Sequence, residues 1–209
     1  INVLIVEDDP MARKLLEIYI NDSEEYKLSQ SIESAAMAEL YCRRNPIDLI
    51  LMDVCTAMDA NGLDAAAKIK KSCPHIKIII VTSQPEFSFI ERARKAGVES
   101  FWYKSASAEE IIEVMNRTMA GDSVYPDTTP SLRLGEALNV DFTEKELLVL
   151  REVVDGEADA DIAEKLGMSL RTVKAHIQNM RDKTGFRNRT ELAVRVRESG
   201  LVINDHKTE

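Results

Sequence analysis

Four aliphatic residues run directly into three acidic residues at Val3–Asp9, where the sequence reads VLIVEDD. A short aliphatic run without polar alternation is typical of a strand that is buried on both faces of a parallel sheet. The stretch has no basic leader and meets acidic residues at once, so it does not read as a signal peptide. It predicts a buried strand with carboxylates at its carboxyl end.

Similar runs recur through the first part of the chain, and each is followed by an amphipathic stretch. The runs lie at Val3–Val6, Leu28–Ile32, Leu49–Asp53, Lys77–Val81 and Ser100–Tyr103, and the helical patterns lie near Met11–Asn21, Ser34–Arg44, Asp64–Ser72, Glu86–Ala96 and Ala108–Met119. Strands that alternate with helices imply a parallel sheet covered on both faces. Residues 1–120 are therefore predicted to form an α/β domain with a doubly wound, five-stranded parallel sheet.

The rest of the chain carries a different pattern. Residues 121–139 are rich in Gly, Pro, Ser and Thr and are predicted to be a linker. Residues 140–209 show helical signals only, beginning with a capping box at Thr143–Glu146. We expect a second, all-α domain here.

Composition excludes several classes of protein. No run of about 18 apolar residues exists, so no membrane span is expected. The three cysteines, Cys42, Cys55 and Cys73, form no CxxC pair, which suits small core side chains in a reducing cytoplasm. The net charge of −9 at first disfavours a nucleic-acid partner. However, Ser169–Arg197 holds eight basic and two acidic residues, about +6, and such a local basic face is what a phosphate backbone meets.

Polar side chains follow four of the predicted strands. Glu7, Asp8 and Asp9 follow the first, Asp53 ends the third, Thr82 ends the fourth and Lys104 follows the fifth. In a doubly wound sheet, ligands bind outside the carboxyl ends of the strands. We therefore expect carboxylates, a hydroxyl and an ammonium group to converge at one edge.

This set of groups is suited to phosphoryl chemistry. Crowded carboxylates repel one another, and a hard divalent cation such as Mg²⁺ relieves that repulsion. A carboxylate can act as a nucleophile toward a phosphoryl group, while the metal and Lys104 neutralise charge on the transferring oxygens. Thr82 can donate to a phosphoryl oxygen. Any one such residue alone would be read as a turn or cap residue.

These residues resemble the receiver domain of two-component response regulators, over about the first 120 residues. The matching segments are Leu4–Pro10, Leu51–Asp53, Ile80–Ser83 and Ala96-Gly97 with Lys104. The resemblance implies a flavodoxin-like fold, phosphorylation of Asp53 by a sensor histidine kinase, and metal binding by Glu7, Asp8, Asp53 and the Cys55 carbonyl. It makes Thr82 the switch hydroxyl, Lys104 the phosphate-sensing lysine and Phe101 the switch aromatic, for which plain core packing is the alternative. The segment Lys104–Glu110 resembles the corresponding segment of the NarL/FixJ subfamily, whose members carry a LuxR-type output domain.

One segment departs from the family pattern. The family has a Met-Pro pair after the phosphorylated aspartate, whereas this chain has Val54–Gly62 without that pair and with a loop one residue longer. That loop borders the predicted metal site.

The second domain is predicted to hold a helix-turn-helix. Ile162–Leu166 ends at a tight turn around Gly167, and Ser169 caps the next helix, which Gly185 stops. The early residues of such a helix reach base edges in the major groove of double-stranded DNA. Lys174 can donate to guanine, Gln178 can pair with adenine or a phosphate, and Ala175 can contact a thymine methyl. Four further side chains are placed for phosphates, namely Ser169, Arg171, Thr172 and Arg181.

This region resembles the LuxR-type helix-turn-helix from about Val140 to Arg197. The shared segments are Phe142–Glu146, Asp161–Ala163, Thr172–His176 and Arg187–Ala193. The resemblance implies that the final helix, with Leu192, Val194 and Val196, helps two copies pair as a homodimer. His176 has no second His or Cys nearby and is read as a packing or surface residue.

Three functions compete at this point. The first is a phosphorylation-gated transcription factor, and the second is a DNA-binding regulator whose atypical receiver no longer responds to phosphate, which only the altered loop supports. The third is an aspartate-nucleophile phosphatase, but this would require Asp-x-Asp, and position 55 is Cys. We therefore expect a regulator and not an enzyme.

Overall fold

The computed structural model describes residues 1–86, 88–104, 108–127, 129–199 and 201. Residues 105–107, within the Lys104–Glu110 motif, and residues 202–209 of the predicted second domain lie outside the described residues. The chain divides into two compact units: Ile1–Ser83 with Phe89–Asp127, and Gln84–Ser88 with Thr128–Glu209.

A five-stranded sheet forms the centre of the first unit. Its strands are β1 (Asn2–Val6), β2 (Lys27–Ile32), β3 (Leu49–Met52), β6 (Lys77–Thr82) and β7 (Ser100–Tyr103). They lie in the order β2-β1-β3-β6-β7, and every neighbouring pair is parallel. The predicted α/β doubly wound sheet is confirmed. The aliphatic runs of β1, β3 and β6 are buried because both faces are covered, whereas the edge strand β2 is only partly buried.

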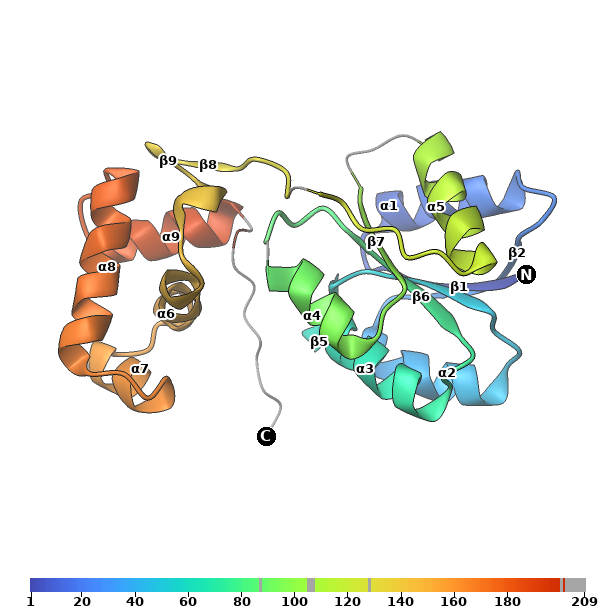
Figure 1. Ribbon diagram of the computed structural model, residues 1–209, viewed down its shortest axis with the longest axis horizontal. Coiled ribbons are helices and arrows are strands. Elements are labelled where there is room, and N and C mark those ends of the chain that lie inside the picture. The colour runs from blue at the N-terminus through green and yellow to red at the C-terminus, as the bar shows by residue number, and fades with distance from the viewer. Residues whose placement is uncertain (87, 105–107, 128, 200, 202–209) are drawn as a thin grey trace. The chain divides into compact units, whose positions relative to one another are not determined.

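Five helices cover this sheet. They are α1 (Pro10–Asn21), α2 (Ala38–Arg44, preceded by a 3-10 turn at Ala35–Met37), α3 (Gly62–Ser72), α4 (Ser88–Ala96) and α5 (Ala108–Ala120). Helices α1 and α5 lie on one face, and α2, α3 and α4 lie on the other (Figure 1). Alternate strand residues such as Val3, Ile5 and Val81 form one buried cluster with Leu16 of α1 and Met115 of α5.

The longer loop after β3 folds into a small hairpin that the sequence pattern did not predict. Its strands are β4 (Cys55–Thr56) and β5 (Ala60–Asn61). Met58 and Asp59 between them have left-handed backbones, with φ of 64° and 52°. Non-glycine residues adopt this conformation infrequently, so the surrounding contacts must hold the turn. Thr56 does so, because its hydroxyl donates to the Ala60 carbonyl (2.6 Å) and accepts from the Ala35 N–H (2.9 Å).

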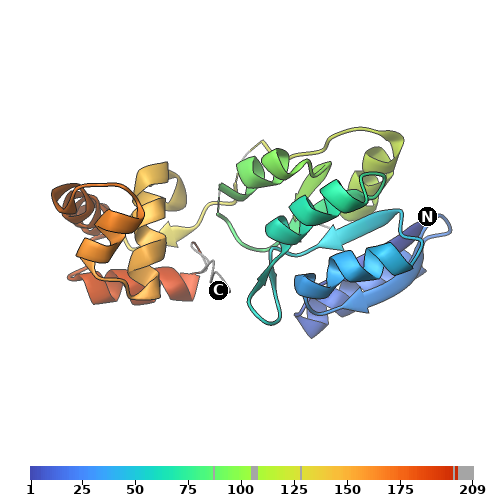
Figure 2. The ribbon, with the colours of Figure 1, turned by 90° about the horizontal axis from the view of Figure 1, so that it is seen from below.

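Within its described residues, the second unit is helical apart from one short hairpin, β8 (Arg133–Leu134) and β9 (Ala137–Leu138). Its helices are α6 (Glu144–Asp155), α7 (Asp159–Lys165), α8 (Leu170–Thr184) and α9 (Arg189–Ser199), and Figure 2 shows them from a second direction. The predicted capping box on α6 is present, and Gly185 ends α8 with a φ of 74°. Leu134 and Ala137, in the segment predicted as linker, are buried in the core of this unit.

The start of α3 constrains the loop that carries Asp53. Gly62 donates its N–H to the Val54 carbonyl (2.8 Å), and a Cβ at this position would lie 1.8 Å from the Asp53 carbonyl oxygen. We predict that Gly62→Ala lowers the free energy of unfolding by about 3 kcal/mol, because backbone must move to admit the methyl group. Gly97→Ala is the matched control, since Gly97 has open space around it and a φ of 78°, so only backbone strain of about 1 kcal/mol is added. Equal losses in urea unfolding would contradict the steric argument.

Candidate functional sites

The carboxyl ends of β1 and β3 bring three acidic residues together. Glu7 follows β1 and is 1% exposed, Asp53 follows β3 and is 7% exposed, and Asp8 is exposed. One carboxylate oxygen from each lies within 4.8 Å of the others. The predicted convergence of strand ends therefore holds for Glu7, Asp8 and Asp53. Oxygen donors at this spacing are the kind that hard divalent cations prefer.

Lys104 joins these carboxylates from the end of β7. Its ammonium nitrogen lies 2.8 Å from Oδ2 of Asp53 and 2.6 Å from Oε2 of Glu7. The backbone N–H of Val54 donates to the other Asp53 oxygen (2.7 Å). Asp53 is thus held at both oxygens, and one cation is shared between two buried acids.

Burial controls the protonation of the pocket. Burial, and next the charge of Asp53, raises the pKa of Glu7 to about 7, although Lys104 opposes the shift. Burial also raises the pKa of Asp53 above its ordinary value, again against Lys104. Burial alone would lower the pKa of Lys104, but Asp53 and Glu7 outweigh it and raise that pKa. Two carboxylates sharing one ammonium are therefore short of positive charge, which a divalent cation would supply.

The remaining predicted pocket residues lie close by in the sheet. Thr82, fully buried at the end of β6, is paired in register with Tyr103, and its carbonyl accepts from the Lys104 N–H (2.9 Å). Phe101 is 1% exposed and packs edge-on against Tyr103, with ring centroids 5.0 Å apart. Cys55 lies in β4, partly buried, two residues beyond Asp53.

Two further residues support the pocket: Arg13, which was missed in the sequence, and Asp9, which was expected among the converging carboxylates but caps α1. Arg13 of α1 donates to the Glu7 carbonyl (2.9 Å) and pairs with Glu33 (3.1 Å). Asp9 caps α1 by accepting from two backbone N–H groups and donates its own N–H to Glu7 (3.1 Å). The order acid, acid, acid, Pro at a helix start is a signal that could have identified Asp9 as a cap, whereas nothing in the local pattern identifies Arg13.

The predicted DNA-facing residues lie along one exposed side of α8. Ser169 caps the helix by accepting from the Thr172 N–H (3.1 Å). The other exposed members are Arg171, Thr172, Lys174, Ala175 and Gln178. Arg181 differs, because it is partly buried, donates to the Gln178 side chain (3.0 Å) and hydrogen-bonds the Arg187 carbonyl in the loop before α9. Arg181 is therefore engaged in holding that loop as well as lying on the basic face.

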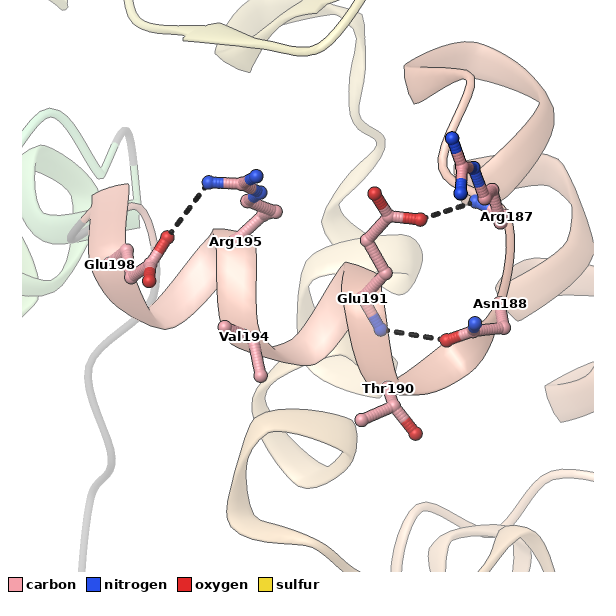
Figure 3. A pocket seen from close by; sticks show the side chains of 7 residues that line it. All are labelled: Arg187, Asn188, Thr190, Glu191, Val194, Arg195 and Glu198. Carbon is pink, nitrogen blue, oxygen red and sulfur yellow. Dashed lines mark hydrogen bonds and ion pairs between the residues drawn. The ribbon is translucent and has the colours of Figure 1, made fainter.

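The residues expected to pair two copies divide into two groups on α9. Leu192 and Val196 have no exposed surface and belong to the core of the second unit, whereas Val194 is 48% exposed. Val194 lines a surface pocket with Thr190, Glu191, Arg195 and Glu198 (Figure 3). Arg195 and Glu198 form an ion pair of 3.3 Å on the same surface. Of these three side chains, Val194 is therefore the exposed one.

No helix within the described part of the chain is both long and apolar enough to cross a lipid bilayer.

Comparisons with known proteins agree with this division of the chain. Residues 3–116 match the model of the response regulator receiver domain, and residues 140–196 match the model of bacterial regulatory proteins of the luxR family. The response regulator protein VraR of Staphylococcus aureus (strain Mu3) is 29% identical over 207 residues, which cover 97% of this chain and 99% of VraR.

Solved structures share the fold. A structure of two RcsB dimers bound to two parallel DNAs covers 94% of this chain and 97% of its own, with a TM-score of 0.61 and 17% identity. A structure of RcsB from Salmonella typhimurium covers 94% of this chain and 99% of its own, with a TM-score of 0.59 and 18% identity. The first family model spans more than half of the chain and the second covers its helical part. The chain therefore belongs to the response regulator family, with a receiver domain followed by a LuxR-type DNA-binding domain.

Proposed function

We propose that this chain is a transcription factor whose DNA binding is controlled by phosphoryl transfer from a sensor histidine kinase to Asp53. The observation that carries this proposal is the position of Asp53, a buried carboxylate held between acidic residues and the ammonium of Lys104. In the transfer, a carboxylate oxygen of Asp53 forms a bond to phosphorus while the bond to the kinase histidine nitrogen breaks and its electron pair returns to that nitrogen. The product is an acyl phosphate on Asp53.

The donor set fits Mg²⁺. Carboxylate oxygens of Glu7, Asp8 and Asp53 and the Cys55 carbonyl would hold the ion, which neutralises charge on the phosphoryl oxygens. Lys104 would then pair with a phosphoryl oxygen, and Thr82 would donate its hydroxyl to another. Phe101, which packs on Tyr103 beside Thr82, would respond to this rearrangement.

The exposed side of α8 is proposed to read double-stranded DNA. Lys174, Ala175 and Gln178 would meet base edges, while Ser169, Arg171 and Thr172 would meet phosphates. Arg181 is assigned a mixed role, because its guanidinium also holds the Arg187 carbonyl. Phosphorylation would favour a homodimer in which Val194 contacts the second copy. Leu192 and Val196 would hold α9 in place by packing in the core of their own unit.

One observation favours the alternative of a receiver that does not respond to phosphate. The loop after Asp53 is a hairpin with two left-handed residues, Met58 and Asp59, beside the acidic pocket. The phosphatase alternative has less support, because Cys55 stands where a second acid would be required.

Phosphorylation of Asp53 is the first test. Incubation with a small phosphodonor and Mg²⁺ is expected to add one acid-labile phosphoryl group, and Asp53→Asn is expected to abolish it, because the amide is not a nucleophile of this kind. Asp59→Asn, in the same loop but exposed, is the matched control and should label normally. Asp8→Ala should label slowly unless Mg²⁺ is raised. A wild-type chain that stays unlabelled would favour the phosphate-independent receiver.

Competition between Lys104 and Mg²⁺ gives a second prediction. Lys104→Met removes the cation that both carboxylates share, so Mg²⁺ should bind more tightly, by a factor on the order of ten, although signalling is lost. Lys27→Met removes the same charge from the start of β2, at the opposite edge of the sheet, and should leave Mg²⁺ affinity unchanged. Thermal unfolding against Mg²⁺ concentration measures both. Weaker Mg²⁺ binding by Lys104→Met would contradict this account.

The DNA contacts give a third prediction. Binding affinity is measured across a salt series on two DNAs, a site selected from random sequences and an unselected sequence. Lys174→Ala should cost about 1–3 kcal/mol on the selected site and relax preference at one position. Arg171→Ala should weaken binding to all sequences and reduce the salt slope by about one. Arg171 is a better probe than Arg181, whose loss would also release the loop before α9. If neither substitution changes affinity or salt slope, α8 is not the DNA-reading helix.

A further inference from the structure

The first residues of the predicted linker are attached to the receiver sheet. β7 is an edge strand, and the N–H of Phe101 on it donates to the Val124 carbonyl (2.8 Å). Val124 in turn donates its N–H to the hydroxyl of Ser100 (3.0 Å). Residues just beyond α5 therefore run along the edge of β7 and belong to the first unit, which extends to Asp127.

Tyr125 packs directly on the aromatic residue of the pocket. Its ring stacks on Phe101, with centroids 6.4 Å apart and an interplanar angle of 29°. The guanidinium of Arg94 on α4 lies 3.8 Å from the centroid of the same ring. The Tyr125 hydroxyl donates to the Val98 carbonyl (2.8 Å), and burial raises the pKa of Tyr125 to about 12.

These contacts complete a continuous path from the acidic pocket to the linker. Lys104 donates its N–H to the Thr82 carbonyl, and Thr82 is paired in register with Tyr103. Tyr103 packs edge-on against Phe101, which has almost no exposed surface, and Tyr125 stacks on the same Phe101 ring. In a close-packed interior, Phe101 cannot change its position without disturbing the rings on either side of it.

We infer that Tyr125 is a positioning residue for Phe101, and that its docking on Phe101 and Arg94 couples the state of Asp53 to the attachment of the linker at Val124. The inference rests on the proposed phosphorylation of Asp53. When Phe101 changes its position, the Tyr125 ring loses its stacking partner. The hydrogen bonds between Val124 and β7 are then broken for a larger fraction of the time. Thermodynamic reciprocity requires the converse as well: a linker that cannot dock makes the phosphorylated arrangement easier to reach.

The test uses the full chain with Mg²⁺ and beryllofluoride, a phosphoryl mimic that binds reversibly. Hydrogen exchange is followed at the amides of Phe101 and Val124, and beryllofluoride affinity is measured by thermal shift. Beryllofluoride should lower protection of these two amides by about fivefold or more, the usual scale of coupling between sites. Tyr125→Ala should lower that protection without the mimic and should tighten beryllofluoride binding by a similar factor.

Two further variants separate positioning from loss of structure. Tyr125→Phe keeps the ring on Phe101 and Arg94 and loses only the bond to the Val98 carbonyl, so it should keep the response to beryllofluoride. Tyr41→Ala is the control. Tyr41 lies on α2, and its hydroxyl is within hydrogen-bonding distance of the Ser29 hydroxyl (3.3 Å), so its loss should leave beryllofluoride affinity unchanged. The wild-type exchange measurement decides the matter even if Tyr125→Ala does not fold.

The outcomes separate this inference from the proposed function. If beryllofluoride with Mg²⁺ does not bind the wild-type chain, the proposed function fails and the inference fails with it. If it binds while the protection of Phe101 and Val124 is unchanged, the inference alone is overturned. Unchanged beryllofluoride affinity in a folded Tyr125→Ala chain would also overturn it.

Discussion

The receiver unit depends on one ammonium group shared between two buried carboxylates. Lys104 meets Glu7 and Asp53 at 2.6 and 2.8 Å, and these three residues follow β7, β1 and β3. An unpaired buried charge is expensive, so the register of the three strands must keep this group together. Burial, and after it the charge of Asp53, raises the pKa of Glu7 even though Lys104 opposes the shift. The same two carboxylates therefore pair with Lys104 and belong to the donor set for a cation, and the two compete for them.

The basic charge of the chain is concentrated in one segment, Ser169–Arg197, which reconciles an acidic chain with DNA binding. The net charge is −9, yet α8 carries Arg171, Lys174, Arg181 and Lys183 with Asp182 as its one acidic residue. Charges more than about 10 Å away are largely screened at physiological salt. The local charge of α8 is therefore a better guide to a polyanionic partner than the charge of the whole chain.

Most of the fold could be predicted from the sequence because three of its strands, β1, β3 and β6, are aliphatic runs that end in polar residues. The convergence of Glu7, Asp53 and Lys104 followed from that pattern. The β4–β5 hairpin could not be predicted, because Met58 and Asp59 adopt left-handed backbones without glycine. The docking of Tyr125 was hidden for a different reason: Gly and Pro marked residues 121–139 as a linker, and composition does not reveal a single aromatic contact with a distant strand.

The loop after Asp53 is anchored at both of its ends close to the nucleophile. Asp53 is fixed from its own side by the Val54 N–H, and Val54 is fixed in turn by the N–H of Gly62, where the absence of a side chain lets α3 begin against the Asp53 carbonyl. The hairpin between Thr56 and Ala60 lies between these two anchored positions, and the Thr56 hydroxyl donates to the Ala60 carbonyl across it. A longer loop is therefore compatible with an unchanged Asp53, and its effects should appear where Met58 and Asp59 are exposed to partners and solvent.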